Sequence, residues 1–507
     1  MVSTITNGYV LLVFFLISFF MKEGYYEIGQ AKYESFFVCS VIYLIVVGLL
    51  HTWQLLGKKE EREGNLCASL FSFTVLDKAV LFYGLWVFLS FCFSSWKKEA
   101  LWGAPGWNMG LVTQLLLVAL YFAVSRTIKP TYEILFGVVG IQYVVFLLGI
   151  LHRFQIDPLG LYVYNELTIP QKQQFLSSVG QATWYSSYLC VLLGLELYGF
   201  LQMENRKLRK FCGGALGISF ASLVTQNSDS AFFALFVLLC FLGAWATYSY
   251  DRLHRFVEMN AILWGSFLGI GLLQRIFPER MVPLEALSIF FSQSVLPFLL
   301  FCITMVFLMV ADAYAHAIIL KGYRIFYKIV LGLAVVAVVG SLLFLWLGTK
   351  GKLENLSLPG YFYFHDRWGS GRGIIWRLTW ESFLEFPLWK KLIGTGPDTF
   401  ATQIYAVEAT GTALRNVWGD STWVSNAHNE FLNITYTLGL GGLISWFFLL
   451  AAGIKEGFTE IKGRDSFWLA AALCVLGYAG HNLFCYAQVC ATPFLFLILA
   501  VARSRKS

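Results

Sequence analysis

Long apolar runs are the feature that most constrains this chain. Runs of roughly 20 residues with few charges recur along its 507 residues, and a helix needs about that length to cross a membrane. The composition agrees, because 58% of the residues are hydrophobic and 13% are charged, against roughly 45–50% and 25% in soluble domains. Backbone polar groups cannot face lipid unpaired, so each run is predicted to be a helix. A soluble enzyme and a disordered chain are both excluded.

The runs predict an all-α, polytopic integral membrane helix bundle with about 12–14 transmembrane helices. No basic segment precedes the first run and no small-residue cleavage site accompanies it, which favours a retained span over a signal peptide. Fourteen candidate spans are centred near Phe15, Leu44, Trp86, Val118, Val145, Leu192, Ile218, Leu238, Phe267, Phe301, Val335, Trp446, Val475 and Leu497.

Lysine and arginine are distributed unevenly between the two sets of loops. Alternating the loops places 20 of the 37 on one side and eight in the short loops of the other. Cytoplasmic loops carry such an excess, so both termini are expected in the cytoplasm. The same pattern explains the net charge of +7 without nucleic acid as a partner. The richer side carries Lys58, Lys59, Arg62, Arg126, Lys129, Arg206, Lys207, Arg209, Lys210, Arg252, Arg255, Lys321, Arg324, Lys328, Lys455, Lys462, Arg464, Arg503, Arg505 and Lys506.

The sequence predicts neither a metal nor a cofactor. Its ten cysteines are scattered and form no disulfide framework or CxxC pattern; Cys485 and Cys490 lie near one turn, but free thiols are favoured. The sequence contains no HExxH, Walker, EF-hand or DxD motif. An enzyme that used cytoplasmic nucleotide sugars would normally carry such a site. The pattern therefore favours chemistry on a substrate that is already carried in the membrane.

One loop is far longer than the others and divides the chain. Residues 349–427 are predicted to form a large extracytoplasmic loop with short amphipathic helices, after an N-terminal transmembrane bundle at 1–348 and before C-terminal transmembrane helices at 428–507. The loop is rich in aromatic residues and has balanced charge, with eight Lys or Arg and seven Asp or Glu. We therefore expect it to be ordered and to lie along the membrane.

The segment GIIWRLTWESFLEF, ending at Phe386, has apolar residues at helical spacing and is predicted to stop before Pro387. Arg377 and Glu381 lie on another face of this helix, where they are either exposed to solvent or part of a site. Arg372 precedes this helix within GSGRG. The neighbouring glycines allow the backbone to bring its guanidinium close to a ligand, which favours a functional role.

Two further motifs follow. GTGPDTF (394–400) is a turn signal, and Lys390 and Lys391 before it either reach lipid headgroups or hold an anion. NAHNEF begins at Asn426, and Ser425 or Asn426 is the expected N-cap of a membrane helix. The first turn would then contain His428, Asn429 and Glu430 at a helix end suited to negative charge. His428 is a proton carrier near neutral pH or else a polar boundary residue.

Three ionisable residues lie next to or within apolar runs. Asp229, in TQNSDSAFF, is either functional or part of a polar outer turn. Asp77 is expected at the boundary of the third span. His481, in GYAGHN, is expected to bind a neighbouring helix rather than to act chemically.

The C-terminal motifs together resemble the O-antigen ligase and polymerase superfamily of bacterial membrane glycosyltransferases. The resemblance lies in GSGRGIIW (369–376), FPLWKKLIGTGPDTF (386–400) and AHNEFLNITYTLGLGGL (427–443), within a motif region at 349–450. It is thinner upstream, in WGAPGWNMGLVT, SSVGQATWYSSYL and TQNSDSAFF. In the last of these, Asp229 stands near the position where many ligases carry a Ser-Arg pair, so the diphosphate contact of that pair is not carried over.

The resemblance implies a multi-pass enzyme of the cytoplasmic membrane. Such enzymes move a glycan from an undecaprenyl-diphosphate donor onto an acceptor hydroxyl of a glycan or glycolipid at the outer face. The family's loop arginine falls on Arg372 and its HN histidine on His428. The implied roles are diphosphate binding by Arg372 and proton acceptance by His428, without a metal and with inversion at the sugar. Substrate binding is assigned to Arg377, Asp229, Glu430, Asn429, Lys390 and Lys391.

Two other functions are alternatives to the enzyme. A flippase or transporter of the same lipid-linked sugars would share the spans and the outer cations. Transporters usually contain internal repeats, and none is evident in this sequence. A scaffold or sensor without activity is disfavoured only by the three ordered motifs.

Overall fold

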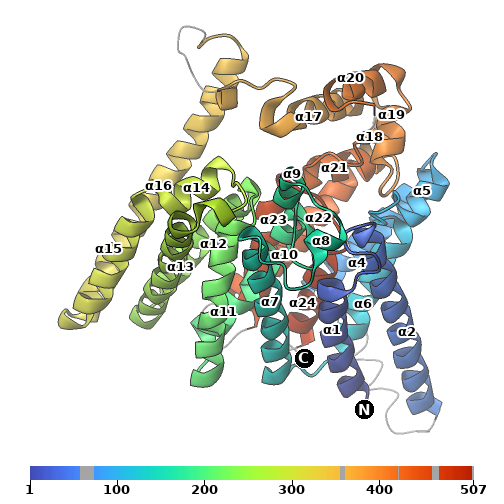
Figure 1. The fold of residues 1–507 in the computed structure, drawn as a ribbon. Helices are drawn as coiled ribbons and strands as arrows, with labels where there is room; N and C mark the ends of the chain where they lie inside the picture. Colours follow the sequence, from blue (N-terminus) through green and yellow to red (C-terminus); the bar gives the residue numbers. More distant parts are fainter. Residues whose placement is uncertain (57–72, 354–359, 421, 460–466, 505–507) are drawn as a thin grey trace.

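The computed structural model describes residues 1–56, 73–353, 360–420, 422–459 and 467–504. Seven of the predicted cytoplasmic cations, Lys58, Lys59, Arg62, Lys462, Arg464, Arg505 and Lys506, lie outside these ranges. The described chain is almost entirely helical (Figure 1), which confirms the all-α, polytopic membrane fold. Its long helices are α1 Val2–Phe19, α2 Ile28–Leu56, α4 Val75–Phe93, α6 Leu111–Thr127, α7 Tyr132–Arg153, α10 Ala182–Gln202, α11 Arg206–Thr225, α12 Asp229–Ala246, α13 Tyr250–Ile276, α15 Leu296–Val310, α16 His316–Thr349, α22 Gly439–Thr459, α23 Trp468–Asn482 and α24 Thr492–Ser504.

Shorter elements connect these helices. In the described part of the chain, β1 and β2 form a two-stranded antiparallel hairpin, which pairs Phe175 with Gln181. The remaining elements are α5 Lys97–Trp102, α8 Leu161–Tyr164, α9 Ile169–Gln174, β1 Phe175–Leu176, β2 Gly180–Gln181, η1 Pro278–Arg280, α14 Ala286–Gln293, η2 Ala311–Ala313, η3 Gly360–Phe362, α17 Trp368–Glu385, α18 Leu388–Ile393, α19 Phe400–Tyr405, α20 Glu408–Trp418 and α21 Glu430–Thr437.

All fourteen predicted span centres lie within helices. Within the described ranges, ten helices are long and apolar enough to cross a membrane. Of the remaining four long helices, α6 and α24 are apolar but shorter, α11 begins with four cations within five residues, and α23 has 15 residues.

The centre of the bundle is the contact between α10 and α23. A Cβ at Gly477 would lie 2.0 Å from the Cys190 carbonyl oxygen, and a Cβ at Gly194 would lie 2.6 Å from the Cys474 backbone nitrogen. Small residues on both helices therefore allow their backbones to touch, as is common between membrane helices. In the most apolar 18-residue window of α10, 94% of residues are buried. This contact fixes the end of α23 that carries Tyr478, His481 and Asn482.

The least buried part of the bundle is the flank formed by α15 and α16. None of the most apolar window of α16 is buried, although its mean hydropathy of 2.7 is the highest among the ten long apolar helices of the described chain. Both helices stand at one side of the bundle in Figure 1. Apolar side chains that face outward along a whole helix belong in lipid, so this flank marks the bilayer contact.

The loop helices gather at one end of the bundle. Figure 1 shows α17, α18, α19 and α20 above the bundle, together with α5, while both termini lie toward the other end. We call these the upper and lower ends. Ile375, Leu378, Phe383 and Phe386 of the GIIWRLTWESFLEF segment (373–386) are buried, as its helical spacing predicted. The helix ends at Glu385, before Pro387.

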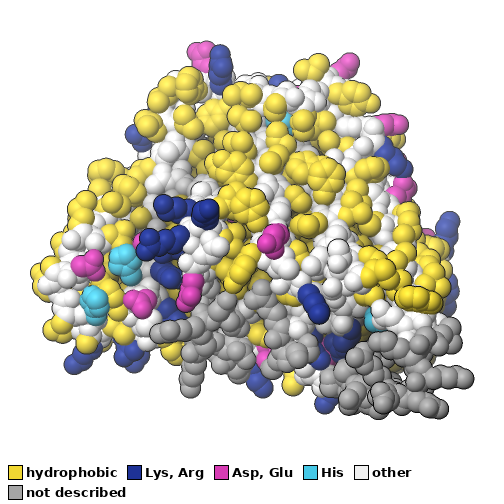
Figure 2. All heavy atoms as spheres, turned by 90° about the horizontal axis from the view of Figure 1, so that it is seen from below, with side chains coloured by type: hydrophobic (Ala, Val, Ile, Leu, Met, Phe, Trp, Pro, Cys, Tyr) yellow, Lys and Arg dark blue, Asp and Glu magenta, His cyan; other side chains and the backbone are white. Residues whose placement is uncertain are grey.

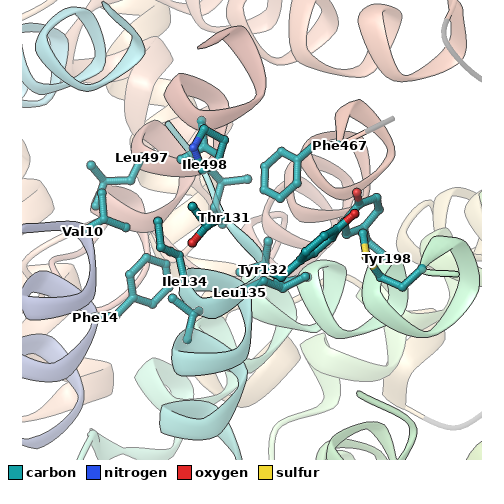
Figure 3. A pocket seen from close by; sticks show the side chains of 15 residues that line it. Val10, Phe14, Thr131, Tyr132, Ile134, Leu135, Tyr198, Phe467, Leu497 and Ile498 are labelled. Atoms are coloured by element: carbon teal, nitrogen blue, oxygen red, sulfur yellow. The ribbon is translucent and has the colours of Figure 1, made fainter. Parts of the chain in front are cut away.

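The lower end carries cations and an apolar crevice. Lys and Arg side chains gather on part of this face (Figure 2). Asp77 lies in the first turn of α4, at the boundary of the third span as predicted, and there it is fully buried and binds both Arg126 and Arg503. A cavity of about 40 Å³ lies near Tyr132, Tyr198 and Leu497 (Figure 3). No charged side chain lines it, so it offers no chemistry.

Candidate active site

A tight left-handed turn presents Arg372 at the upper end. Gly369, Ser370 and Gly371 have φ values of 58°, 61° and 90°, which break the first turn of α17. A Cβ at Gly373 would lie 2.0 Å from the His365 carbonyl oxygen, so only glycine permits this packing. Arg372 lies between the two glycines and is partly buried. The glycines of GSGRG therefore allow the backbone on either side of Arg372 to turn sharply and to pack closely against the preceding loop.

The HN motif forms a second turn beside α17. His428 has a φ of 48°, and its backbone NH donates to Asn426 Oδ1 at 3.0 Å. The indole NH of Trp376 donates to the Ala427 carbonyl at 3.0 Å, and the Ala427 NH donates to Asn433 Oδ1 at 3.1 Å. Both α17 and α21 thus hold the turn that carries His428.

The predicted N-cap of this helix is wrong by three or four residues. Asn429 caps α21, because its side chain accepts the Leu432 NH at 2.9 Å, so neither Ser425 nor Asn426 does. His428 consequently precedes the helix and does not lie in its first turn. The helix also stops at Leu438, and α22 starts anew at Gly439, which has a φ of 71°. Glycine tolerates the positive φ at the second break, and neither break is visible in the apolar pattern.

Arg372 and His428 lie within electrostatic reach of one another. Asp229, exposed at the start of α12, interacts electrostatically with the same guanidinium. In the described chain Arg372 makes no hydrogen bond or ion pair. A mostly enclosed arginine without a bound carboxylate is free to bind a polyanion.

Burial sets the charge states of these groups. It lowers the pKa of His428 to about 4, with a smaller contribution from the positive charge of Arg372. The imidazole is therefore neutral at physiological pH and has a lone pair available. Burial also lowers the pKa of Arg372, but arginine remains charged in proteins.

Glu430 lies below the turn in a closed polar network. It accepts hydrogen bonds from the Tyr478 hydroxyl at 2.6 Å and the Asn482 amide at 2.7 Å. Burial raises the pKa of Glu430 to about 7, although these two hydrogen bonds act to lower it. Its oxygens are occupied by α23, so Glu430 ties α21 to the central helix pair.

Two residues that the sequence did not assign join the site. His481 is fully buried, its Nδ1 lies 3.2 Å from Asn482 Oδ1, and its Nε2 has no hydrogen-bond partner in the described chain. It also interacts electrostatically with Arg372. Tyr486 packs edge-on against His428, with ring centroids 5.3 Å apart. The unsatisfied nitrogen of His481 is the signal that a polar ligand completes the site.

Other predicted residues have partners elsewhere. Arg377 binds Asp366 through both terminal oxygens and also Glu381, on the exposed face of α17. Lys390 donates to Gln403 Oε1 at 3.1 Å and lies over the Phe386 ring. The Asn429 side chain is the helix cap described above. In the described chain no hydrogen bond or ion pair joins these residues, or Lys391, to Arg372 or His428.

The GTGPDTF motif has a positioning role that its turn signal did not reveal. Asp398 Oδ2 accepts the backbone NH groups of Ala104 at 2.8 Å and Met109 at 3.0 Å. The motif therefore holds the loop between α5 and α6, which carries Trp107. Trp107 packs edge-on against Tyr486, with centroids 4.8 Å apart. Only the tertiary structure could show this, because the partners are nearly 300 residues apart.

A small cavity completes the site. It measures about 40 Å³, room for one or two water molecules, and is lined by Trp107, Asp398, Asn426, Glu430 and Tyr486 among others. This narrow cavity adjoins the turn that carries His428, and its walls combine aromatic rings with polar side chains.

Residues 281–447 match the family described as O-antigen ligase, and this confirms the resemblance predicted from the motifs. The matched segment includes Arg372, His428, Asp398 and Glu430. No curated protein matches the chain. The match supports a membrane glycosyltransferase-like function in polysaccharide biosynthesis by a multi-pass membrane protein.

Proposed function

We propose that this chain, whose residues 281–447 match the O-antigen ligases, transfers a glycan from an undecaprenyl-diphosphate donor to an acceptor hydroxyl at the outer face of the cytoplasmic membrane. The observation that carries the proposal is the meeting of an unpaired Arg372 with a neutral His428 at the upper end of the bundle. A flippase would need no proton acceptor at such a point. No observation in the structure favours that alternative over the enzyme.

Arg372 binds the diphosphate of the donor. The departing diphosphate is a polyanion, and a guanidinium stabilises it through paired, charge-assisted hydrogen bonds of roughly 1.5–3 kcal/mol. His481 Nε2 supplies a further hydrogen-bonding nitrogen, since it is buried without a partner in the described structure. Asp229 orients the guanidinium from the exposed side.

His428 accepts the proton of the acceptor hydroxyl. The acceptor oxygen attacks the anomeric carbon, the bond between that carbon and the phosphate oxygen breaks, and its electron pair leaves with the diphosphate. The hydroxyl proton passes to the imidazole, a contribution of order 10²–10⁴ to the rate. Attack opposite the leaving group inverts the anomeric centre, so product with retained configuration contradicts this route.

Donor binding strengthens this base. The positive charge of Arg372 contributes to the low pKa of His428, and a bound diphosphate neutralises that charge. The pKa of His428 therefore rises when the donor is present, and the imidazole becomes a better proton acceptor at the moment it is needed.

The test uses the full chain in proteoliposomes with a lipid-diphosphate glycan extracted from the cells that express it. Arg372→Lys is expected to lower kcat/KM about 10- to 100-fold, since lysine lacks the planar fork. His428→Ala is expected to lower kcat about 10²- to 10⁴-fold while donor binding persists. Arg415→Lys, on the surface of α20, is the matched control and keeps normal turnover. Normal turnover by both site variants discards the proposal.

A further inference from the structure

A large groove adjoins the site at the upper end. It measures about 950 Å³ and lies between the start of α2, the α5–α6 loop, the β1–β2 hairpin and the start of α10. We call it the upper groove. Its walls combine indole rings, Trp102, Trp107 and Trp184, with the polar side chains of Gln30, Lys98 and Gln181.

These walls have the chemistry that recognises carbohydrate. Indole faces pack against the apolar C–H face of a pyranose, and amide side chains donate to and accept from its hydroxyls. Trp102 is half exposed, and the Gln181 side chain makes no hydrogen bond in the described chain. An isoprenoid tail would require a wholly apolar surface, whereas this groove carries Lys98 and Glu27.

Aromatic rings connect the upper groove to the site. Trp107 packs against Trp184, with centroids 5.5 Å apart, and against Tyr486. The Trp184 indole NH donates to the Tyr486 hydroxyl at 3.3 Å, and the Tyr486 ring packs against His428. Trp107 therefore lines both the upper groove and the small cavity beside Glu430, and Tyr486 connects this aromatic wall to the proposed base.

The upper groove is preformed. Asp398 holds both ends of the loop that carries Trp107, as described above. A Cβ at Gly29 would lie 2.6 Å from the Trp184 ring and 2.9 Å from the Gly106 carbonyl oxygen, so glycine lets α2 pack against both. The Asn108 amide also donates to Gln30 Oε1 at 2.7 Å. Rigid walls of this kind reduce the entropy lost on binding.

We propose that the upper groove binds the acceptor glycan, a chain of pyranoses that directs its terminal hydroxyl past Trp107 and Tyr486 to His428. This inference rests on the proposed function for its direction of transfer, because the donor diphosphate occupies the other side of the base at Arg372. Binding of the glycan itself requires only the groove.

The test measures direct binding of the oligosaccharide released by mild acid from the host's lipid-linked glycan to the full chain in detergent. Trp102→Ala and Gln181→Ala are expected to weaken this binding about tenfold, and in transfer assays to raise KM for the acceptor with kcat unchanged. Trp53→Ala is the control, because that exposed tryptophan lies near the opposite end of α2. Gln181→Ala covers the case in which Trp102→Ala fails to fold.

Equal affinities of the wild type and both groove variants overturn the inference, and so does a wild type that binds no oligosaccharide. Failure of the proposed function looks different, since Arg372→Lys and His428→Ala would then turn over normally. Oligosaccharide binding lost in Trp102→Ala would in that case still identify the upper groove as a glycan site.

Discussion

His428 and Glu430 are two residues apart, yet burial moves their pKa values in opposite directions. The charged form of a histidine is the protonated one, so burial lowers its pKa to about 4. The charged form of a glutamate is the deprotonated one, so burial raises its pKa to about 7. A pH profile therefore distinguishes His428, the proposed base, from Glu430 in that role.

The acid limb of kcat/KM is expected near pH 4, because lowering the pH through the pKa of His428 protonates the base and removes its lone pair. The acid limb of kcat is expected at a higher pH than that of kcat/KM, since the bound diphosphate raises the pKa of His428. Steady-state kinetics between pH 4 and 8 measure both. A limb of kcat/KM near pH 7 that disappears in Glu430→Gln would instead identify Glu430 as the base.

Asp77 is a second residue whose role depends on distant partners. Its carboxylate binds Arg126 and Arg503 and accepts the Tyr121 hydroxyl at 2.9 Å, all at the lower end. Asp77→Ala leaves two arginines without their buried counter-ion, and we expect a loss of about 3–5 kcal/mol in the free energy of unfolding. Unfolding in detergent measures it. Glu34→Ala, which breaks the exposed pair with Lys22, should change stability by no more than about 1 kcal/mol.

At the scale of elements, backbone turns present the site. The left-handed turn of α17 and the turn before α21 are joined by the Trp376 hydrogen bond to Ala427. Trp376 also stacks on Phe484, with centroids 6.2 Å apart, which attaches α17 to the segment after α23. Because the loop helix is held to the bundle at two points, the arginine and the histidine keep their relative positions.

Gly373→Ala is expected to displace the start of α17, since its Cβ would lie 2.0 Å from the His365 carbonyl oxygen and the backbone must move. Transfer activity should fall at least tenfold while the protein still folds, as judged by size-exclusion chromatography and thermal unfolding. The matched variant is Gly369→Ala, whose nearest atom is 3.8 Å away, so only its positive φ opposes the change, at about 1–2 kcal/mol. Equal activity of the two variants contradicts this account.

At the scale of the whole molecule, the helix bundle has two different ends. Both termini lie at the lower end, and Asp77 binds Arg503 near the C-terminus, while α17 and α21, the helices of the candidate site, lie at the upper end (Figure 1). From the excess of Lys and Arg in the predicted cytoplasmic loops, we propose that the upper end lies outside the cell.

Cysteine labelling tests this orientation. In a cysteine-free background, a membrane-impermeant maleimide added to intact cells should label a cysteine placed at Glu408 of α20. The same reagent should label one placed at Lys207 of α11 only after the cells are opened. The reverse pattern would place the site in the cytoplasm.

Much of this molecule was predictable from local pattern. Every predicted span centre lies in a helix, because a run of about 20 apolar residues has few other structures available in lipid. The buried face of α17 follows from the spacing of its apolar residues. Its end before Pro387 follows because proline lacks a backbone NH and cannot continue a helix. The turn before Arg372 was recognisable because its glycines permit positive φ values that other residues resist.

The tertiary structure alone decided which side chains meet. Asp398 caps a loop almost 300 residues away, His481 is buried without a partner for Nε2, and Arg377 is paired with Asp366. Hydropathy reports which residues enter the membrane, but it carries no information on which helices touch. That depends on small-residue contacts such as those of Gly194 and Gly477, whose effect exists only once both helices are in place.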